Sequence, residues 1–343
     1  MEAEEPLKIG IIGCGMFSNL FKFMAKKVDN IKIIAATDVV FKKAKSIGGK
    51  NHAYIDSNQM YNNEDIDAVY IATPHYLHMP QIKQAFEAGK HILCEKPVAC
   101  SVEDARKINE LDKKFHNLKL GFDYNYRYDY VCHELASAIQ NGHLDKIYYA
   151  NCNIFFSRDE AYFKNGMWRT KWDTSGGGTL LTHGSHIIDI MIWALGEPIS
   201  VMGKIDTLKF PDLIEVEDVG FGIVEFENEV HAQINCACLI TPPMSVFQDK
   251  VELQIFGQKG YCLYNGPWPS SLKWKGVEKY SLEMEPQNKD QPHLVNSIKA
   301  FADWVLHDIP YFNTTEESSK VLRLIKALYK SSETEKKEII EKL

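Results

Sequence analysis

Short apolar runs alternate with amphipathic segments through the first 124 residues. The runs at Lys8–Ile12, Ile31–Asp38 and Asp67–Thr73 have the length and the β-branched content of buried strands. Strands that alternate with helices are typical of an α/β fold with a doubly wound parallel sheet. The same pattern predicts strands at Ile92–Cys94 and Leu118–Tyr124, and helices at Phe17–Val28, Pro80–Ala88 and Ser101–Phe115.

The pattern changes after residue 124. A helical stretch at Asp129–Asn141 leads into an aromatic and β-branched strand at Lys146–Phe156. Several strand-like runs follow between Ile199 and Leu263, and they predict a mostly antiparallel sheet. With 343 residues the chain is long enough for two domains, which we place at residues 7–124 and 125–343. The later elements are strands at Val219–Phe226, Glu229–Ile240 and Lys250–Phe256, and closing helices at Leu294–His307 and Glu316–Ser332, which could contact the first domain.

Composition narrows the class of protein. With 45% hydrophobic and 25% charged residues the chain is an ordinary globular protein, and its net charge of -7 argues against a nucleic-acid partner. It has neither an apolar run of about 20 residues for a membrane span nor a signal-peptide core in its acidic N-terminus. Eight scattered cysteines suit free thiols in a reducing cytoplasm, and we interpret Cys236 and Cys238 as buried thiols and predict no metal site.

A glycine-rich turn follows the first predicted strand. In Gly13-Cys-Gly15-Met16-Phe17-Ser18 the first glycine permits a tight turn and the second permits close approach of a pyrophosphate. Ser18 takes the place of the third glycine, where a small residue suffices for packing. The pyrophosphate would lie on the N-terminus of the next helix, near Met16 and Phe17. The turn therefore predicts a dinucleotide site.

An acid ends the second predicted strand. Asp38 lies twenty residues after Ser18, close to the spacing of a carboxylate that binds the adenosine ribose hydroxyls. It could instead cap a helix or a turn. A carboxylate at this place repels a 2′-phosphate, so NAD is favoured over NADP, although Lys42 and Lys43 follow closely.

The stretch Lys90–Pro97 has polar residues where a strand ends. Glu95, Lys96 and Pro97 come directly after Ile92–Cys94, and ligands of open α/β sheets bind beyond the carboxyl ends of the strands. Pro97 also restricts the backbone of Lys96. Taken alone, Glu-Lys-Pro is more often a surface turn than part of a ligand site.

Together, Gly13-x-Gly15, Ala72-Thr73-Pro74 with His78, and Glu95-Lys96-Pro97 resemble the glucose-fructose oxidoreductase / inositol dehydrogenase (Gfo/Idh/MocA) family. The resemblance implies a Rossmann domain followed by an α/β domain with a large open sheet. It also implies a homodimer or homotetramer formed through that sheet, and nicotinamide-dependent oxidation or reduction of sugars and cyclitols.

The resemblance also implies site residues. Asn125–Asp129 is similar to the family's Asn-x-Arg-aromatic segment, with Tyr130 where proline is usual. The expected cofactor-binding residues are Gly13, Gly15, Met16, Phe17, Asp38, Thr73, Pro74, His78, Glu95, Lys96, Pro97 and Arg127. The expected substrate-binding residues are Lys96, Tyr124, Trp168, Arg169, His183 and His186.

A predicted helix over Thr179–Trp193 follows Gly176–Gly178. Thr182, His186 and Asp189 stand at i, i+4 and i+7 and would share one face. A lone histidine on such a helix is commonly a packed side chain, but the resemblance makes His186 catalytic together with Lys96. Thr182 is the third expected catalytic residue. Inositol dehydrogenase-like members carry aspartate at its place, whereas threonine accepts a hydrogen bond but brings no charge. The helix N-terminus should also disfavour a charged imidazole.

The segment Ser157–Ser175 lacks clear periodicity and mixes aromatic with basic residues. Trp168 and Arg169 are the strongest candidates in it for contacts to a polar, ring-shaped ligand, one that could carry a carboxylate or phosphate. The same residues suit a loop held on its own domain or on a second subunit.

These observations favour an NAD-dependent oxidoreductase of CH–OH groups in a sugar, cyclitol or sugar derivative. Lys96 would stabilise negative charge on the reacting oxygen, and His186 would take the hydroxyl proton. Two alternatives remain open: a catalytically silent NAD(P)-sensing regulator, and an NAD-dependent glycosidase that works through a transient ketone.

Overall fold

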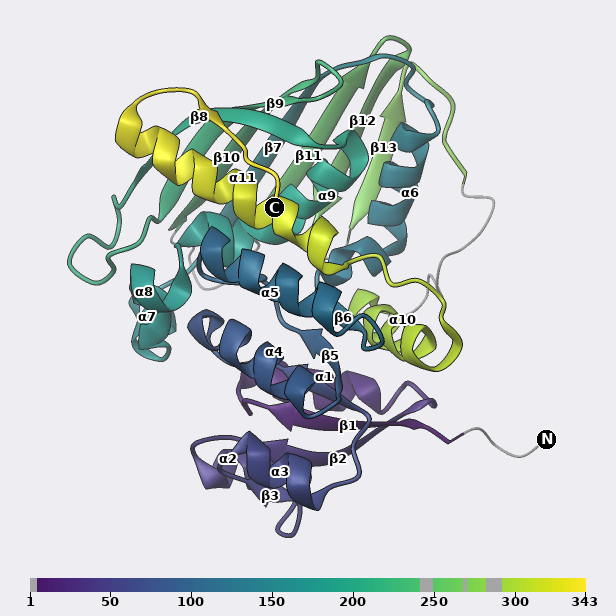
Figure 1. The fold of residues 1–343 in the computed structure, drawn as a ribbon. Helices are drawn as coiled ribbons and strands as arrows, with labels where there is room; N and C mark the ends of the chain where they lie inside the picture. The colour runs from purple at the N-terminus through teal and green to yellow at the C-terminus, as the bar shows by residue number, and fades with distance from the viewer. Residues whose placement is uncertain (1–4, 241–248, 268–269, 282–291) are drawn as a thin grey trace. The chain divides into compact units, whose positions relative to one another are not determined.

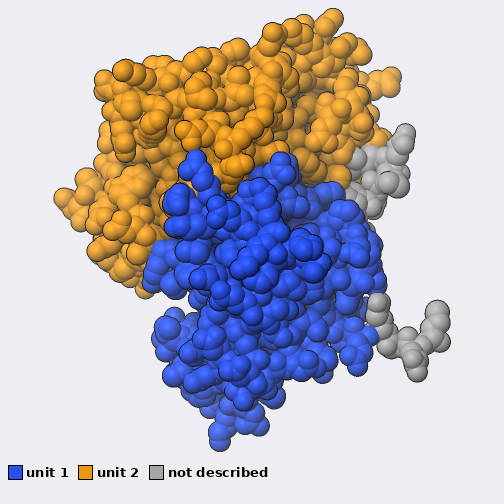
Figure 2. All heavy atoms as spheres, in the orientation of Figure 1, with its two compact units in different colours: residues 1–99, 103–128, 290–318 blue, residues 100–102, 129–289, 319–343 orange. Residues whose placement is uncertain are grey.

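The computed structural model describes residues 5–240, 249–267, 270–281 and 292–343. Residues 1–4, which begin the acidic N-terminus expected to lack a signal-peptide core, lie outside the described residues. The chain divides into two compact units, coloured separately in Figure 2. The first unit comprises Met1–Ala99, Glu103–Tyr128 and Asp290–Ser318, and the second comprises Cys100–Val102, Asp129–Lys289 and Ser319–Leu343.

A six-stranded sheet in the order β3-β2-β1-β4-β5-β6 forms the centre of the first unit (Figure 1). All neighbouring strands are parallel, which confirms the predicted doubly wound sheet. The strand order reverses between β1 and β4, where such sheets bind ligands. The strands are β1 (Leu7–Ile12), β2 (Ile31–Thr37), β3 (Ala53–Tyr54), β4 (Ala68–Ile71), β5 (His91–Cys94) and β6 (Leu120–Phe122).

Helices from distant parts of the sequence contribute to this unit. The 3₁₀ turn η1 (His75–Leu77) leads directly into α4. The helices of the first unit are α1 (Met16–Ala25), α2 (Phe41–Gly48), α3 (Ser57–Asn63), α4 (His78–Glu87), α5 (Val102–Lys114), the 3₁₀ turn η2 (Asn125–Tyr128) and α10 (His293–His307).

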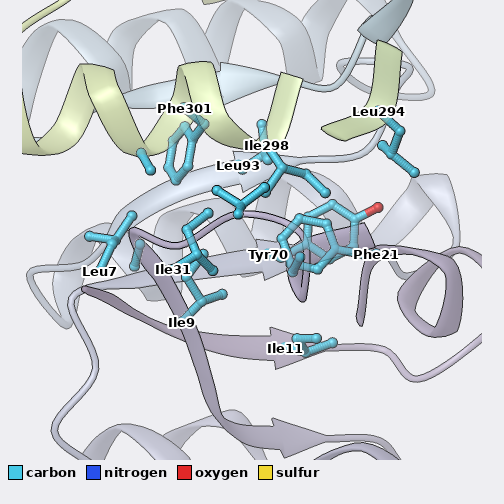
Figure 3. Packing of buried hydrophobic residues seen from close by; sticks show 14 of the residues in the cluster. Leu7, Ile9, Ile11, Phe21, Ile31, Tyr70, Leu93, Leu294, Ile298 and Phe301 are labelled. Carbon is cyan, nitrogen blue, oxygen red and sulfur yellow. The ribbon is translucent and has the colours of Figure 1, made fainter. Parts of the chain in front are cut away.

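The core of the first unit includes α10 as well as the sheet. Leu294, Ile298 and Phe301 from one face of α10 lie in the same buried cluster as Ile9 of β1 (Figure 3). The amphipathic pattern of α10 is satisfied by this contact, because its apolar stripe is removed from water.

An eight-stranded sheet in the order β13-β12-β11-β7-β10-β9-β8-β14 forms the second unit (Figure 1). Only β7 and β10 are parallel neighbours among these described strands; the other pairs are antiparallel, as predicted for the larger part of this sheet. The strands are β7 (Ile147–Ser157), β8 (Pro198–Asp206), β9 (Val219–Phe226), β10 (His231–Ile240), β11 (Lys250–Gly257), β12 (Gly260–Gly266), β13 (Ser271–Lys275) and β14 (Glu338–Ile339).

Helices cover one face of this sheet. The helix α9 (Ser185–Leu195) contacts α6 (Tyr130–Gln140), β7 and β11, and α11 (Thr315–Thr334) lies along β8 and β9 (Figure 1). The residues of β9 alternate between buried and exposed. Met202, Phe221 and Ile223 consequently present large apolar side chains on the face that no described helix covers, called the uncovered face below, where they are 54%, 49% and 57% exposed.

Two stretches contain elements that the sequence pattern does not reveal. Residues 41–63 form α2, β3 and α3, although lysine, asparagine and serine weaken their hydrophobic pattern. The segment Ser157–Ser175, before the glycine triplet, contains helices that are too short to show a helical hydrophobic periodicity. These are α7 (Glu160–Lys164), the 3₁₀ turn η3 (Met167–Thr170) and α8 (Trp172–Ser175).

Candidate functional site

The turn between β1 and α1 has the geometry of a phosphate-binding loop. Gly13 has a φ of +84°, and a Cβ there would lie 2.7 Å from Cγ2 of Thr73. Gly15 has open space around its Cα, so a ligand can approach the backbone. The first N–H groups of α1 lack intrahelical acceptors, Met16 and Phe17 are exposed, and the buried Ser18 hydroxyl donates to Gly13 O. The turn therefore fits a pyrophosphate.

Asp38 joins the end of β2 to this turn. One carboxylate oxygen accepts the N–H of Cys14 at 2.8 Å, and the other accepts the N–H of Val40 at 2.8 Å. Each oxygen keeps a second lone pair, so the half-buried carboxylate can still accept hydrogen bonds from ribose hydroxyls. Asp38 thus supports the turn and fits the predicted ribose contact.

His78 connects the ends of two neighbouring strands. Its Nδ1 lies 2.8 Å from Pro97 O and its Nε2 lies 3.2 Å from Thr73 O, and the ring is completely buried. Burial lowers the pKa of His78 to about 4 against the opposing effect of the two carbonyl groups. The ring is therefore neutral at physiological pH and donates one hydrogen bond, for which the shorter contact to Pro97 is the better acceptor. His78 holds the Thr73–Pro74 and Glu95–Pro97 segments together from within the protein.

Two buried carboxyl groups lie near Lys96. Glu95 accepts the Tyr70 hydroxyl at 2.6 Å, and Asp123, at the end of β6, accepts the Ser297 hydroxyl at 2.6 Å. Burial raises the pKa of both carboxyl groups; the charge of Asp123 raises that of Glu95 further, and the Lys96 ammonium lowers both. Lys96 itself is only 9% exposed. Its positive charge therefore interacts with two acidic groups in a medium of lower dielectric than water.

Tyr124 and Arg127 are both deeply buried. Nη1 of Arg127 donates to Phe312 O and to a carboxylate oxygen of Glu317, each at 3.3 Å. These contacts connect η2 to the segment after α10 within the first unit. The geometry assigns Arg127 a structural partner in addition to its predicted cofactor role.

Glu217 binds the backbone at the start of the segment that carries the candidate histidines. Its carboxylate accepts the N–H of Gly178 at 2.6 Å and the N–H of Leu180 at 2.9 Å, and its backbone carbonyl accepts the N–H of Thr179 at 3.0 Å. The hydroxyl of Tyr329 in α11 donates to the same carboxylate at 2.9 Å. Burial raises the pKa of Glu217 to about 7 despite these donors.

The glycine triplet is required by this arrangement. A Cβ on Gly178 would lie 1.8 Å from Glu217 O, and one on Gly177 would lie 2.2 Å from Tyr329 Oη. Gly176 has a φ of +77°, and its carbonyl accepts the ammonium of Lys326. When ionised, Glu217 also opposes the partial positive charge of the helix N-terminus. The expectation that the helix N-terminus also disfavours a charged imidazole stays a prediction.

The segment after the triplet starts as a π-helical turn, η4 (Leu180–Gly184), and continues as α9. This differs from the regular α-helix expected over Thr179–Trp193, because a π turn contains an extra residue and shifts the register of the polar stripe. His186 lies half-buried in the first turn of α9, and Asp189 is buried one turn later. Single π turns occur frequently at functional sites.

Hydrogen bonds fix the orientation of His183. Nε of Arg158 donates to His183 Nε2 at 3.1 Å, so the proton of the neutral ring is assigned to Nδ1. Nδ1 lies 2.8 Å from the Thr182 hydroxyl, which donates to Gly178 O at 2.6 Å. Arg158 in turn pairs with Asp249 at 3.1 Å. Thr182 thus contacts His183 directly, a neighbour that the predicted helical face did not include.

Trp168 and Arg169 lie in η3, close to these groups. The guanidinium of Arg169 stacks on the rings of Trp168 and Tyr162, at 4.4 and 5.2 Å from their centroids. Arg169 also lines a cavity together with Thr182 and His183. The structure thus brings Arg169 together with two of the predicted site residues.

Sequence reasoning missed Glu217, Asp123 and Arg158. Asp123 follows β6 as Glu95 follows β5, so the rule about carboxyl ends of strands would have found it. Glu217 and Asp218 lie between two valines. Acidic residues within an apolar stretch predict buried carboxylates, which are rare unless they have partners. Arg158 belongs to the segment that the sequence singles out.

Among the residues that the structure describes, no helix is long and apolar enough to cross a membrane. No three histidine, cysteine or acidic side chains there are arranged to hold a metal ion.

Known protein families and individual proteins match most of this chain. Residues 7–122 match the model of an oxidoreductase family with an NAD-binding Rossmann fold, and residues 132–262 match the GFO/IDH/MocA C-terminal domain. The chain is 27% identical to D-glucoside 3-dehydrogenase of Escherichia coli (strain K12), over 96% of each chain. It is 28% identical to glucose-6-phosphate 3-dehydrogenase of Bacillus subtilis (strain 168), over 92% of this chain and 95% of that one.

A solved structure shares the fold. The WlbA dehydrogenase from Bordetella pertussis, in complex with NADH and UDP-GlcNAcA, superposes with a TM-score of 0.85. The likeness covers 98% of this chain and 99% of that one at 23% sequence identity.

Proposed function

The chain belongs to the Gfo/Idh/MocA family of oxidoreductases with an NAD-binding Rossmann fold, and we propose that it is an NAD-dependent dehydrogenase acting on a secondary hydroxyl or ketone of a sugar or sugar derivative. The observation that carries the proposal is Lys96, nearly buried at the end of β5 with Glu95 and Asp123 as opposing charges. The names of the two relatives, which concern glucosides and glucose 6-phosphate, support a glucose-like substrate.

The roles of the residues follow from their chemistry. Bound NAD supplies the hydride acceptor, and the turn from Gly13 to Ser18 together with Asp38 would hold its pyrophosphate and ribose. The Lys96 ammonium stabilises negative charge on the reacting oxygen. His186 takes the hydroxyl proton, and the Arg158–His183–Thr182 hydrogen bonds fix the orientation of the neighbouring His183 imidazole.

Turnover of a substrate panel tests this function. The purified chain is incubated with NAD and a set of sugars, inositols, uronates and sugar phosphates, and reduced cofactor is followed by absorbance. We expect formation of reduced cofactor with at least one of them. Binding of NADH without any turnover would favour the NAD-sensing regulator, and release of free sugar from glycosides without net NADH would favour the glycosidase.

Asp38 is expected to make NADH bind more tightly than NADPH. Its carboxylate would repel the 2′-phosphate, so Asp38→Ser should lower the ratio of the NADPH to the NADH dissociation constant. Fluorescence titration of both reduced cofactors measures this ratio. Asp29→Ser, which removes an exposed carboxylate after α1, is the control. Tighter binding of NADPH by the unmodified chain would contradict the assignment.

The uncovered face of the eight-stranded sheet is proposed to bind a second copy of the chain. Met202 pairs with Ile223 and Lys204 pairs with Phe221 across β8 and β9, so the exposed apolar side chains form one patch. Burial of this patch against its symmetry mate would remove it from water. The mass of the protein in solution, as a dimer or tetramer against a monomer, tests this proposal.

A further inference from the structure

The guanidinium of Arg169 is held in place from three sides. The rings of Trp168 and Tyr162 contact it at 4.4 and 5.2 Å from their centroids. Gly166 lies so close that a Cβ there would be 1.9 Å from Arg169 Nη1. Stacking on aromatic rings uses the faces of a guanidinium and leaves the N–H donors in its plane available. Arg169 is therefore a positioned cation whose donors can still bind a ligand.

Other charged groups around the same cavity already have partners. Both oxygens of Asp218 accept backbone N–H groups, from Leu208 at 2.8 Å, from Lys209 at 2.8 Å and from Phe210 at 3.0 Å. Glu217 accepts the N–H groups at the start of the π turn. Backbone amides thus satisfy these carboxylates, which need no arginine as a hydrogen-bond partner.

The two arginines near this cavity, Arg158 and Arg169, differ in whether a carboxylate pairs with them. Arg158 also contacts the Tyr162 ring, at 5.3 Å from its centroid, and is paired with Asp249. Within the described part of the chain, no carboxylate forms an ion pair with Arg169. Of the two guanidinium groups on the Tyr162 ring, Arg158 is thus paired with a carboxylate, whereas Arg169 keeps its in-plane donors for a ligand.

We propose that Arg169 binds an anionic group of the sugar substrate, a carboxylate or a phosphate. The inference rests on the proposed function and specifies its substrate class. A planar guanidinium matches both anions through paired N–H donors, and its pre-set orientation reduces the entropy lost on binding. Thr182 and His183 line the cavity beside Arg169, so the anion would be recognised close to the segment that carries His186.

Equilibrium binding separates this inference from the catalytic proposal. Protein saturated with NADH is titrated calorimetrically with glucose, glucuronate and glucose 6-phosphate, and the two acidic ligands distinguish a carboxylate from a phosphate. We expect at least one acidic ligand to bind at least about tenfold more tightly than glucose, which is the lower range for a hydrogen bond to a charged group. Arg169→Gln should remove this preference, and Arg169→Lys should restore part of it.

The matched control is Lys164→Gln, which removes a charge from an exposed side chain on the neighbouring α7. It should leave the preference unchanged. Equal affinity for glucose and both acidic ligands, or a preference that survives Arg169→Gln, would overturn the inference while leaving the dehydrogenase proposal intact. An Arg169-dependent preference without turnover of any sugar would support the anion site and contradict the dehydrogenase. Arg169→Lys and thermal melting identify a loss that is due only to misfolding.

Discussion

Replacing Lys96 by alanine is expected to lower kcat/KM for sugar oxidation by at least about a hundredfold, the low end for a positioned acid–base or electrostatic group. The Lys96 side chain is 9% exposed, so its charge acts on the reacting oxygen through a medium of lower dielectric than water. Steady-state kinetics measures the loss. A titration with NADH shows whether the variant still binds cofactor, which separates loss of chemistry from loss of the cofactor site.

A control variant and a conservative variant show whether the loss in Lys96→Ala is specific to the Lys96 ammonium. Lys83→Ala removes an ammonium from α4 that is 56% exposed, and it should keep full activity. Lys96→Arg keeps the charge but changes its shape, so it should recover only part of the rate. Unchanged kcat/KM in Lys96→Ala would remove Lys96 from the mechanism.

The buried acids provide a second readout for Lys96→Ala. The ammonium lowers the pKa values of Glu95 and Asp123, so its removal should raise both. Infrared difference spectra should then show the protonated carboxyl band persisting to higher pH than in the unmodified chain. The band would not move if Lys96 were distant from these acids.

Replacing Glu217 by alanine is expected to lower both the free energy of unfolding and the turnover number. The substitution leaves the N–H groups of Gly178 and Leu180 and the hydroxyl of Tyr329 without their carboxylate acceptor. Each buried donor without a partner costs about 1–3 kcal/mol, so we expect a loss of about 3 kcal/mol or more. Urea unfolding measures the stability, and kcat reports whether the π turn with Thr182 and His183 keeps its position.

The pH dependence of stability gives a test that a general packing defect would not reproduce. The pKa of Glu217 is raised from 4.5 to about 7 in the folded chain, so the folded state binds more protons than the unfolded state between these values. Its contribution is therefore fully present below pH 4.5 and is lost as the pH rises through about 7. Glu217→Gln should flatten this decline, whereas Glu215→Ala, at an exposed neighbouring position, should leave it unchanged. An unaltered decline in Glu217→Gln would show that another group is responsible.

The sequence predicts best where one local pattern determines the outcome. The strands β1, β2 and β4 are predominantly apolar runs, and Gly13 and Gly15 lie in the turn where their lack of a side chain is needed. Asp38 and Lys96 are recognisable because Asp38 comes directly after β2 and Lys96 comes two residues after β5. Periodicity fails for α7 and α8, which are only five and four residues long.

Features that depend on distant residues could not be predicted. The acceptor for the Gly178 N–H lies 39 residues away in Glu217, and Tyr329 lies 112 residues beyond that glutamate. The π turn at Leu180–Gly184 is equally invisible, since its sequence also satisfies an α-helical pattern. The contact between Thr182 and His183 follows from that turn and was therefore missed as well.

The position of α10 has a consequence for synthesis of the protein. Ile298 and Phe301 belong to the same buried cluster as Ile9 and Tyr70, although nearly 300 residues separate the two ends of this cluster in the chain. A ribosome releases Ile9 early and Phe301 late, so the nascent Rossmann sheet waits with an uncovered apolar face while the second unit is translated. A fragment that ends at Tyr128 would expose the same face permanently. The last layer of this unit therefore forms late in synthesis, and chaperones that shield apolar surface can bind during that interval.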